Sequence, residues 1–176
     1  MRTTVFLSVL LLATASILQA EDNGKAEFSA AATSKFAPMP GLPACASLSV
    51  QRGDPSKGAA VILLKAASGC VIPWHWHTVN ESLVMVNGRA KIEMKDGAPV
   101  TFRPGDFIFL PGKHTHQFSC LAACMLYVMP DGAFDIHYVD ASGKEISPDE
   151  AIKTPAAKDH STKMKMSAPA AKTKEQ

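Results

Sequence analysis

The sequence carries little net charge. Its 176 residues include 18 Lys and Arg against 16 Asp and Glu, so the formal net charge is +2. Residues 151–176 hold six Lys against two acidic residues, whereas residues 21–150 hold 11 basic and 14 acidic residues. The central part is therefore mildly acidic, and the sequence lacks the basic footprint of a nucleic-acid-binding protein.

The scarcity of arginine limits the class of substrate that the protein can bind. Between residues 21 and 150 the chain has only Arg52, Arg89 and Arg103, and no two of them are adjacent. A nucleotide-sugar or phosphosugar substrate would need clustered cations for its phosphates, so an epimerase of that kind is disfavoured. The sequence also lacks the signatures of a nucleophilic serine and of a phosphate-binding loop.

A long apolar run is missing, and the short one that exists is N-terminal. MRTTVFLSVLLLATASILQA has an early Arg2, an apolar run from Val5 to Leu12 and small residues before EDNGK. This is typical of a secretory signal peptide cleaved after Ala20, whereas a membrane span would need about 20 apolar residues. We therefore expect a periplasmic or secreted protein that is not held in a membrane after cleavage.

Cysteine is rare but even in number. The chain has only Cys45, Cys70, Cys120 and Cys124, and their spacings do not resemble a zinc ribbon. In an exported protein four cysteines favour disulfides and allow three pairings; buried free thiols are the alternative. The sequence predicts at least one bridge without choosing its partners.

Short apolar runs separated by turn residues fill the centre of the chain. Asn87-Gly88 and Asp96-Gly97 suit tight hairpins because their residues tolerate positive φ, and the LAA after Cys120 suits a small turn. Eight or more short strands with a turn every 8–12 residues predict an all-β sandwich or barrel. The strands expected beside these turns include Glu81–Val86, Arg89–Met94, His116–Cys120 and Met125–Met129.

One short helix and two polar ends complete the expected organisation. SPDEAIK places Ser147 as the N-cap, Pro148 at the first helical position and Glu150 three residues after the cap, which is a capping box. We expect a signal peptide over residues 1–20, an arm over 21–37, the β domain over 38–150 and a disordered, Lys- and Ala-rich tail over 151–176.

The histidines are concentrated in one part of the chain. Four of the six fall between His75 and His116, as two H-x-H pairs. Because residues i and i+2 of a strand face the same side, His75 and His77 project together, about 6–7 Å apart along the backbone. Neutral imidazoles with a nearby carboxylate suit Zn, Fe, Mn, Ni or Co, so the sequence predicts a divalent transition metal as cofactor.

The first H-x-H pair belongs to a longer pattern. GCVIPWHWHTVNESLVMVNG, residues 69–88, matches G-x5-H-x-H-x3-E-x6-G at every defined position, and it resembles the first motif of the cupin superfamily. The resemblance implies a double-stranded β-helix, a jelly-roll barrel with a metal inside. It also implies His75, His77 and Glu81 as ligands of that metal.

A later segment resembles the second cupin motif, G-x5-P-x-G-x2-H-x3-N, less fully. In GDFIFLPGKHTHQFSC, residues 105–120, Gly105, Pro111 and His116 fall in place. The resemblance therefore implies His116 as the fourth ligand. The only two histidines of this segment are His114 and His116, and His114 remains an alternative ligand.

Two positions of this second segment depart from the motif. Lys113 occupies the glycine position, with Gly112 one residue early, and Cys120 occupies the asparagine position. The departures leave the geometry of the loop before His116 open. His137 lies outside both motifs, and we expect it to be a strand residue with local hydrogen bonds.

The only two tryptophans, Trp74 and Trp76, alternate with the histidines. If His75 and His77 point into the barrel, both indoles point out, and adjacent exposed indoles usually mark an interface. We therefore expect a homodimer with the tryptophans near its interface, with cover by the N-terminal arm or by a loop as the alternatives. The same alternation places four side chains inward, which makes the lining near the metal mainly apolar: Leu83, Met85, Phe118 and Cys120.

These patterns together suggest two functions. The first is a metal-dependent dioxygenase, decarboxylase or isomerase acting on a small, largely apolar oxygenated molecule, with Glu81 as the general base. The second is a non-catalytic cupin that binds a small ligand or a metal, because a fold does not fix its chemistry.

Overall fold

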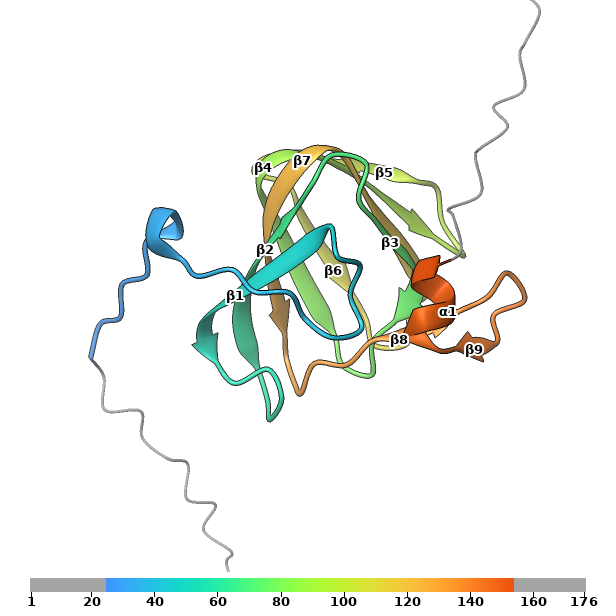
Figure 1. Ribbon diagram of the computed structural model, residues 1–176, viewed down its shortest axis with the longest axis horizontal. Helices are drawn as coiled ribbons and strands as arrows, with labels where there is room; N and C mark the ends of the chain where they lie inside the picture. Colours follow the sequence, from blue (N-terminus) through green and yellow to red (C-terminus); the bar gives the residue numbers. More distant parts are fainter. Residues whose placement is uncertain (1–24, 154–176) are drawn as a thin grey trace, which may run out of the picture.

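β-strands dominate the part of the chain that the structure describes, residues 25–153 of a computed structural model (Figure 1). The predicted signal peptide and nearly all of the predicted tail lie outside these residues. The elements in chain order are η1 (Ala31–Thr33), β1 (Ala46–Gly53), β2 (Ala60–Ala66), β3 (Val71–Trp76), β4 (Glu81–Met94), β5 (Val100–Phe102), β6 (Phe107–Leu110), β7 (His116–Pro130), β8 (His137–Val139), β9 (Glu145–Ile146) and α1 (Pro148–Lys153).

The strands of the described residues pair antiparallel throughout. They follow the order β1-β2-β7-β3-β8-β9, and β4 pairs with β5, β6 and β7. The first half of β4 pairs with β6, the second half pairs with β5, and its whole length pairs with β7. The strands thereby wrap around one interior, with α1 beside β8 and β9 (Figure 1). The predicted all-β jelly-roll class is confirmed.

The two longest strands bend together, which corrects two predicted turns. Glu81–Val86 and Arg89–Met94 are not a hairpin about Asn87-Gly88 but one strand, β4, with register shifts around residues 85–90. Gly88 has φ +88° and lies against the Ala123 carbonyl, where a side chain would overlap. The two strands expected on either side of LAA are likewise one bent strand, β7, which faces the β4 bulge. Asn-Gly thus makes a bulge, because the β7 ladder continues across it.

Alternating side chains of these strands form the core. The inward positions Leu83, Met85, Phe118 and Cys120 are at most 5% exposed, as the sequence predicted. Burying an aliphatic side chain stabilises the fold by roughly 1.5–3 kcal/mol. The other large members of the core include Ile62, Leu64, Ile72, Ile92, Phe102, Leu110, Leu126, Val128 and Tyr138.

Segments near both ends of the described chain contact the barrel. In the arm, Ala37 pairs with Leu48 of β1, and Lys65 Nζ lies 4.7 Å from the Phe36 ring centroid. At the other end, the Glu150 amide donates to Ser147 Oγ at 3.2 Å, which confirms the predicted N-cap. The helix runs from Pro148 to Lys153, the last residue of the SPDEAIK segment in which it was predicted.

The cysteines form two disulfides, so the prediction of at least one bridge is confirmed. Cys45 is bonded to Cys70 and joins the start of β1 to the start of β3. Cys120 is bonded to Cys124 and spans the bend of β7. Among the described residues no helix is long and apolar enough to cross a membrane.

Candidate metal centre

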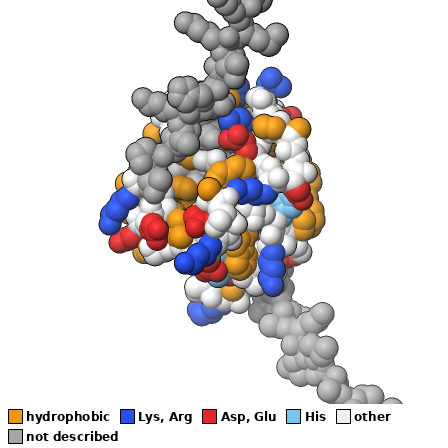
Figure 2. Space-filling model, turned by 90° about the vertical axis from the view of Figure 1, so that its right-hand side faces the viewer, with side chains coloured by type: hydrophobic (Ala, Val, Ile, Leu, Met, Phe, Trp, Pro, Cys, Tyr) orange, Lys and Arg blue, Asp and Glu red, His pale blue; other side chains and the backbone are white. Residues whose placement is uncertain are grey.

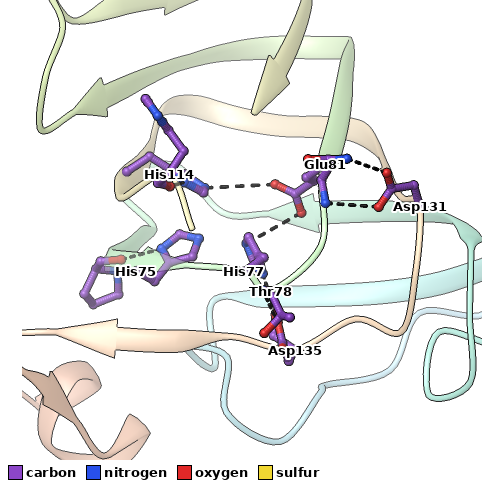
Figure 3. A network of polar contacts seen from close by, with 10 residues as sticks. His75, His77, Thr78, Glu81, His114, Asp131 and Asp135 are labelled. Carbon is purple, nitrogen blue, oxygen red and sulfur yellow. Dashed lines mark hydrogen bonds and ion pairs between the residues drawn. The ribbon is translucent and has the colours of Figure 1, made fainter. Parts of the chain in front are cut away.

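Three histidines meet inside the barrel. His75 in β3 and His116 at the start of β7 are cross-strand partners. β3 ends at Trp76, so His77 stands at the start of a connector, residues 77–80, that leads to Glu81 at the start of β4. The four side chains expected to bind a metal are therefore adjacent. Figure 3 shows three of them, His75, His77 and Glu81.

Each imidazole is oriented by a backbone carbonyl. His75 Nδ1 donates to Pro73 O at 2.6 Å, and His116 Nδ1 donates to His114 O at 2.9 Å. His77 Nδ1 donates to Asp135 O. A carbonyl can only accept, so the Nδ1 atom of each ring carries the proton and Nε2 keeps its lone pair. This is the arrangement that metal-binding histidines require.

The potential ligand atoms lie close together and out of the solvent. One ring nitrogen of each histidine lies within 4.8 Å of the others. Glu81 Oε1 lies 3.7 Å from His77 Nε2, and Glu81 Oε2 lies 4.0 Å from His116 Nε2. All four residues are at most 5% exposed.

Burial sets the charge state of this cluster. It lowers the pKa of His75 well below its ordinary value, and repulsion from His116 and His77 adds to the effect. Burial likewise lowers the pKa of His77 and of His116, in the latter case against the attraction of Glu81. Burial raises the pKa of Glu81 to about 7, against the opposing influence of His116. The imidazoles are therefore neutral, as lone-pair donors must be.

The donor set fits a transition-metal ion. Such ions bind imidazole nitrogen and carboxylate oxygen at about 2.0–2.2 Å, so two ligands of one ion lie no more than about 4.4 Å apart. Both distances from Glu81 are within that limit. The separation of up to 4.8 Å between histidine nitrogens exceeds it by a few tenths of an ångström, which small side-chain rotations can close. Three nitrogens and one oxygen suit Fe, Mn, Zn, Ni or Co.

The cluster forms the polar part of an apolar cavity. The space between the lining atoms is about 490 Å³, part of which opens to solvent. Within the described chain, the lining includes no Lys or Arg. The remaining lining side chains are hydrophobic: Leu42, Leu48, Ile62, Leu64, Ile72, Leu83, Phe118, Leu126, Val128, Phe134 and Ile136.

The loop before His116 keeps its form despite the departures from the second motif. Lys113 occupies the glycine position with φ 64°, in the left-handed region that favours glycine. Its amide donates to His77 O at 2.7 Å, and the Gly112 amide donates to Asn80 Oδ1 at 2.9 Å. The loop is thus bonded to the connector that carries His77, and His116 enters the cluster in the expected register.

The comparisons with known proteins agree with this fold. A family model described as a cupin domain matches residues 63–130, which contain all four of the clustered residues. Residues 63–130 of the chain are therefore a cupin domain. No curated protein matches the sequence of this cupin.

Solved structures show the same fold at low sequence identity. The polyketide cyclase RemF from Streptomyces resistomycificus is 16% identical, with a TM-score of 0.60 over 74% of this cupin and 95% of that chain. A putative acetylacetone dioxygenase from Methylibium petroleiphilum is 16% identical, with a TM-score of 0.54 over 73% and 91% of the two chains. Structures of the DMSP lyases RdDddP and RnDddQII match at 21% identity and a TM-score of 0.49, over 54% of this cupin and about half of that chain, 53%.

The other two described histidines lie outside the cluster. His114, the alternative ligand, has its Nε2 3.3 Å from Asp96 Oδ1, without the geometry of a hydrogen bond. His137 in β8 bonds to Glu145 Oε1 at 2.8 Å and to Asp135 Oδ2 at 3.2 Å. The expectation of local hydrogen bonds for His137 is confirmed.

The two tryptophans lie on the other side of β3 and are half-buried. Lys95 Nζ lies 4.6 Å from the Trp74 ring centroid, and Trp76 stacks on His137 with centroids 3.9 Å apart. Both indoles are therefore partly covered by the chain's own side chains. On the face seen in Figure 2, acidic and basic side chains are interspersed, and neither sign gathers into one patch.

Two residues of the site carry no sequence signal. Asp135 orients His77, and the Phe134 ring lies 4.9 Å from the His77 ring, centroid to centroid. Both come from the segment after β7, which lies outside the two motifs. Their role depends on a contact across 58 residues, which spacing along the chain does not reveal.

Proposed function

We propose that this cupin is a metal-dependent enzyme whose divalent transition metal is held by His75, His77, Glu81 and His116. The observation that carries the proposal is the convergence of three neutral imidazoles and one carboxylate at one end of an apolar cavity. A purely structural cluster would gain little from burying four polar side chains, because desolvation of such groups costs free energy.

The cavity indicates the substrate class. A bound Fe, Mn, Zn, Ni or Co ion would supply Lewis acidity, and Fe or Mn also redox chemistry with dioxygen. The apolar walls would hold the hydrocarbon part of a small oxygenated molecule, and its oxygen atoms would face the histidines. Glu81 is the group that would hold or move a proton, since it is the only carboxylate lining the cavity among the described residues.

The reaction we propose is of the dioxygenase, decarboxylase or isomerase type. One structure that shares the fold is described as a putative acetylacetone dioxygenase, so the scaffold is compatible with the first of these. The alternative is a cupin that binds a small ligand or metal without turnover, which would need the same four residues.

Two further parts of the proposal concern location and assembly. Export to the periplasm or the medium is supported by the two disulfides, which persist in oxidising compartments. A homodimer is supported by Phe107 and Phe109 of β6, which are 62% and 54% exposed. A monomeric mass by light scattering at micromolar concentration would contradict the dimer.

The test of the enzyme proposal combines metal content with turnover. The His77→Ala variant is expected to lose bound metal and activity together, while a folded variant with full metal content would refute the ligand assignment. Uptake of O2 that depends on an added small oxygenated molecule would support the oxygenase. Tight zinc with no turnover across a panel of such molecules would instead support the binding protein.

A further inference from the structure

His77 is held differently from the other two imidazoles of the cluster. His75 and His116 each donate to the carbonyl two residues earlier in the chain, so local backbone fixes their rings. His77 follows the end of β3, and its acceptor is Asp135, 58 residues later. The orientation of His77 therefore depends on a contact between two loops.

Asp135 makes this contact with its carboxylate as well as with its carbonyl. Its Oδ1 accepts the Thr78 amide at 2.8 Å, and its Oδ2 accepts His137 Nε2 at 3.2 Å. In Figure 3, Asp135 lies beside both His77 and Thr78. The carboxylate thus anchors the residue whose carbonyl holds the His77 ring.

The neighbours of Asp135 line the cavity. Phe134 and Ile136 both line it, both are half-buried, and both lie outside the strands. We call residues 131–136 the closing segment. Its other end is bonded to the same connector, because Asp131 accepts the Asn80 amide at 3.0 Å and Asn80 Nδ2 at 2.6 Å.

We propose that Asp135 is a positioning residue for His77 that couples the closing segment to the metal site. The inference rests on the metal centre proposed above. Lifting the closing segment to admit a ligand breaks the bond from His77 Nδ1 to Asp135 O and frees the ring. Conversely, a metal ion bound to His77 holds the closing segment, and with it Phe134, over the cavity.

The test is the Asp135→Ala variant of the full chain, with Glu145→Gln as its control. Glu145 is the second partner of His137 and has no contact with the His77–Thr78 connector in the described structure. Loss of a group that orients a metal ligand typically weakens metal binding by about 10–100-fold. We expect Zn²⁺ release to a chelator to accelerate by that factor in Asp135→Ala and to stay at the wild-type rate in Glu145→Gln.

A second readout needs no metal. Long-range ¹H–¹⁵N spectra of the metal-free protein are expected to show His77 protonated at Nδ1 in the wild type and as a mixture of tautomers in Asp135→Ala. His75 and His116 should keep the Nδ1–H form in both. An unchanged His77 tautomer together with an unchanged rate of Zn²⁺ release would overturn the inference.

Hydrogen exchange of the wild type covers the case in which Asp135→Ala does not fold. Zn²⁺ is expected to slow exchange of the Thr78 and Phe134 amides by roughly tenfold or more, because a bound ligand raises the free energy of local opening. The reference is the Gly69 amide, which donates to Cys120 O at 2.8 Å and lies outside the cavity lining. Equal exchange with and without bound Zn²⁺ would refute the coupling. Two results together would refute the metal centre and still support the positioning role of Asp135. These are a wild type that binds no metal, and an Asp135→Ala variant in which His77 is no longer protonated at Nδ1 alone.

Discussion

A substitution at Gly112 tests how the loop before His116, residues 111–113, supports the site. A Cβ built at Gly112 lies 2.6 Å from the Thr78 carbonyl oxygen, where real Cβ atoms stay at least 3.0 Å away. In Gly112→Ala the two loops must therefore separate by at least about 0.4 Å. Thr78 follows His77, and ligand distances in metal sites tolerate only about 0.2 Å. The substitution should thus disturb metal binding as well as packing.

The expected effects have separate magnitudes. Overpacking of this kind typically costs about 1–3 kcal/mol, so the free energy of unfolding of the metal-free protein should fall by that amount in urea denaturation. Zn²⁺ affinity, measured by competition with a coloured chelator, should fall by about 10–100-fold. Gly58→Ala is the matched control, because a Cβ at Gly58 meets nothing within 4 Å.

Two outcomes would refute this reasoning. If Gly112→Ala unfolds and binds Zn²⁺ as the wild type does, the close approach to Thr78 is not a constraint. If stability falls while affinity is unchanged, residues 111–113 absorb the displacement, and the loop does not position His77.

Three further predictions concern other parts of the fold. Lys113→Gly should raise the free energy of unfolding by about 0.5–1 kcal/mol in urea denaturation. The left-handed backbone costs a lysine about 1–2 kcal/mol, and the larger entropy that glycine loses on folding offsets part of that gain. A loss of stability would contradict the φ argument. Ser147→Ala should cost about 0.5–2 kcal/mol through loss of the α1 cap, and no change would mean that the cap bond is dispensable. Burial lowers the pKa of His137, but bonds to Glu145 and Asp135 outweigh it and raise the pKa. The stabilisation from protonated His137 is therefore complete at pH below about 6.5 and is lost as pH rises through the higher pKa of the folded state. The wild type should unfold at a higher temperature than His137→Gln, by a larger margin at pH 5.5 than at pH 8.5, where the stacking of His137 on Trp76 remains; an equal margin at both pH values would contradict the pKa argument.

Local patterns predicted most of the barrel but not its long strands. Alternation correctly placed Leu83 and Phe118 inside, because period 2 is a property of any paired strand. The prediction of a hairpin at Asn87-Gly88 was wrong, because a dipeptide that allows positive φ can form a bulge as well as a turn. Only the partner strand decides between them, and here β7 runs on beside β4 across the bulge.

The site was predictable where its residues are close in sequence. His75, His77 and Glu81 come from one segment, and the structure brings them together with His116. Asp135 and Phe134 were missed, because the closing segment meets the connector only in the folded chain. The stacking of His137 on Trp76 was missed for the same reason, since the two residues are paired across neighbouring strands but are 61 positions apart in the sequence.

The central claim is that four residues of this cupin hold one transition-metal ion, and elemental analysis tests it most directly. The protein, purified from its native source, should contain close to one equivalent of Fe, Mn, Zn, Ni or Co per chain. His116→Ala should fold with the wild-type circular dichroism spectrum and lose most of that metal. A folded wild type that stays metal-free after exposure to these ions, or a His116→Ala variant with the wild-type content, would contradict the metal centre.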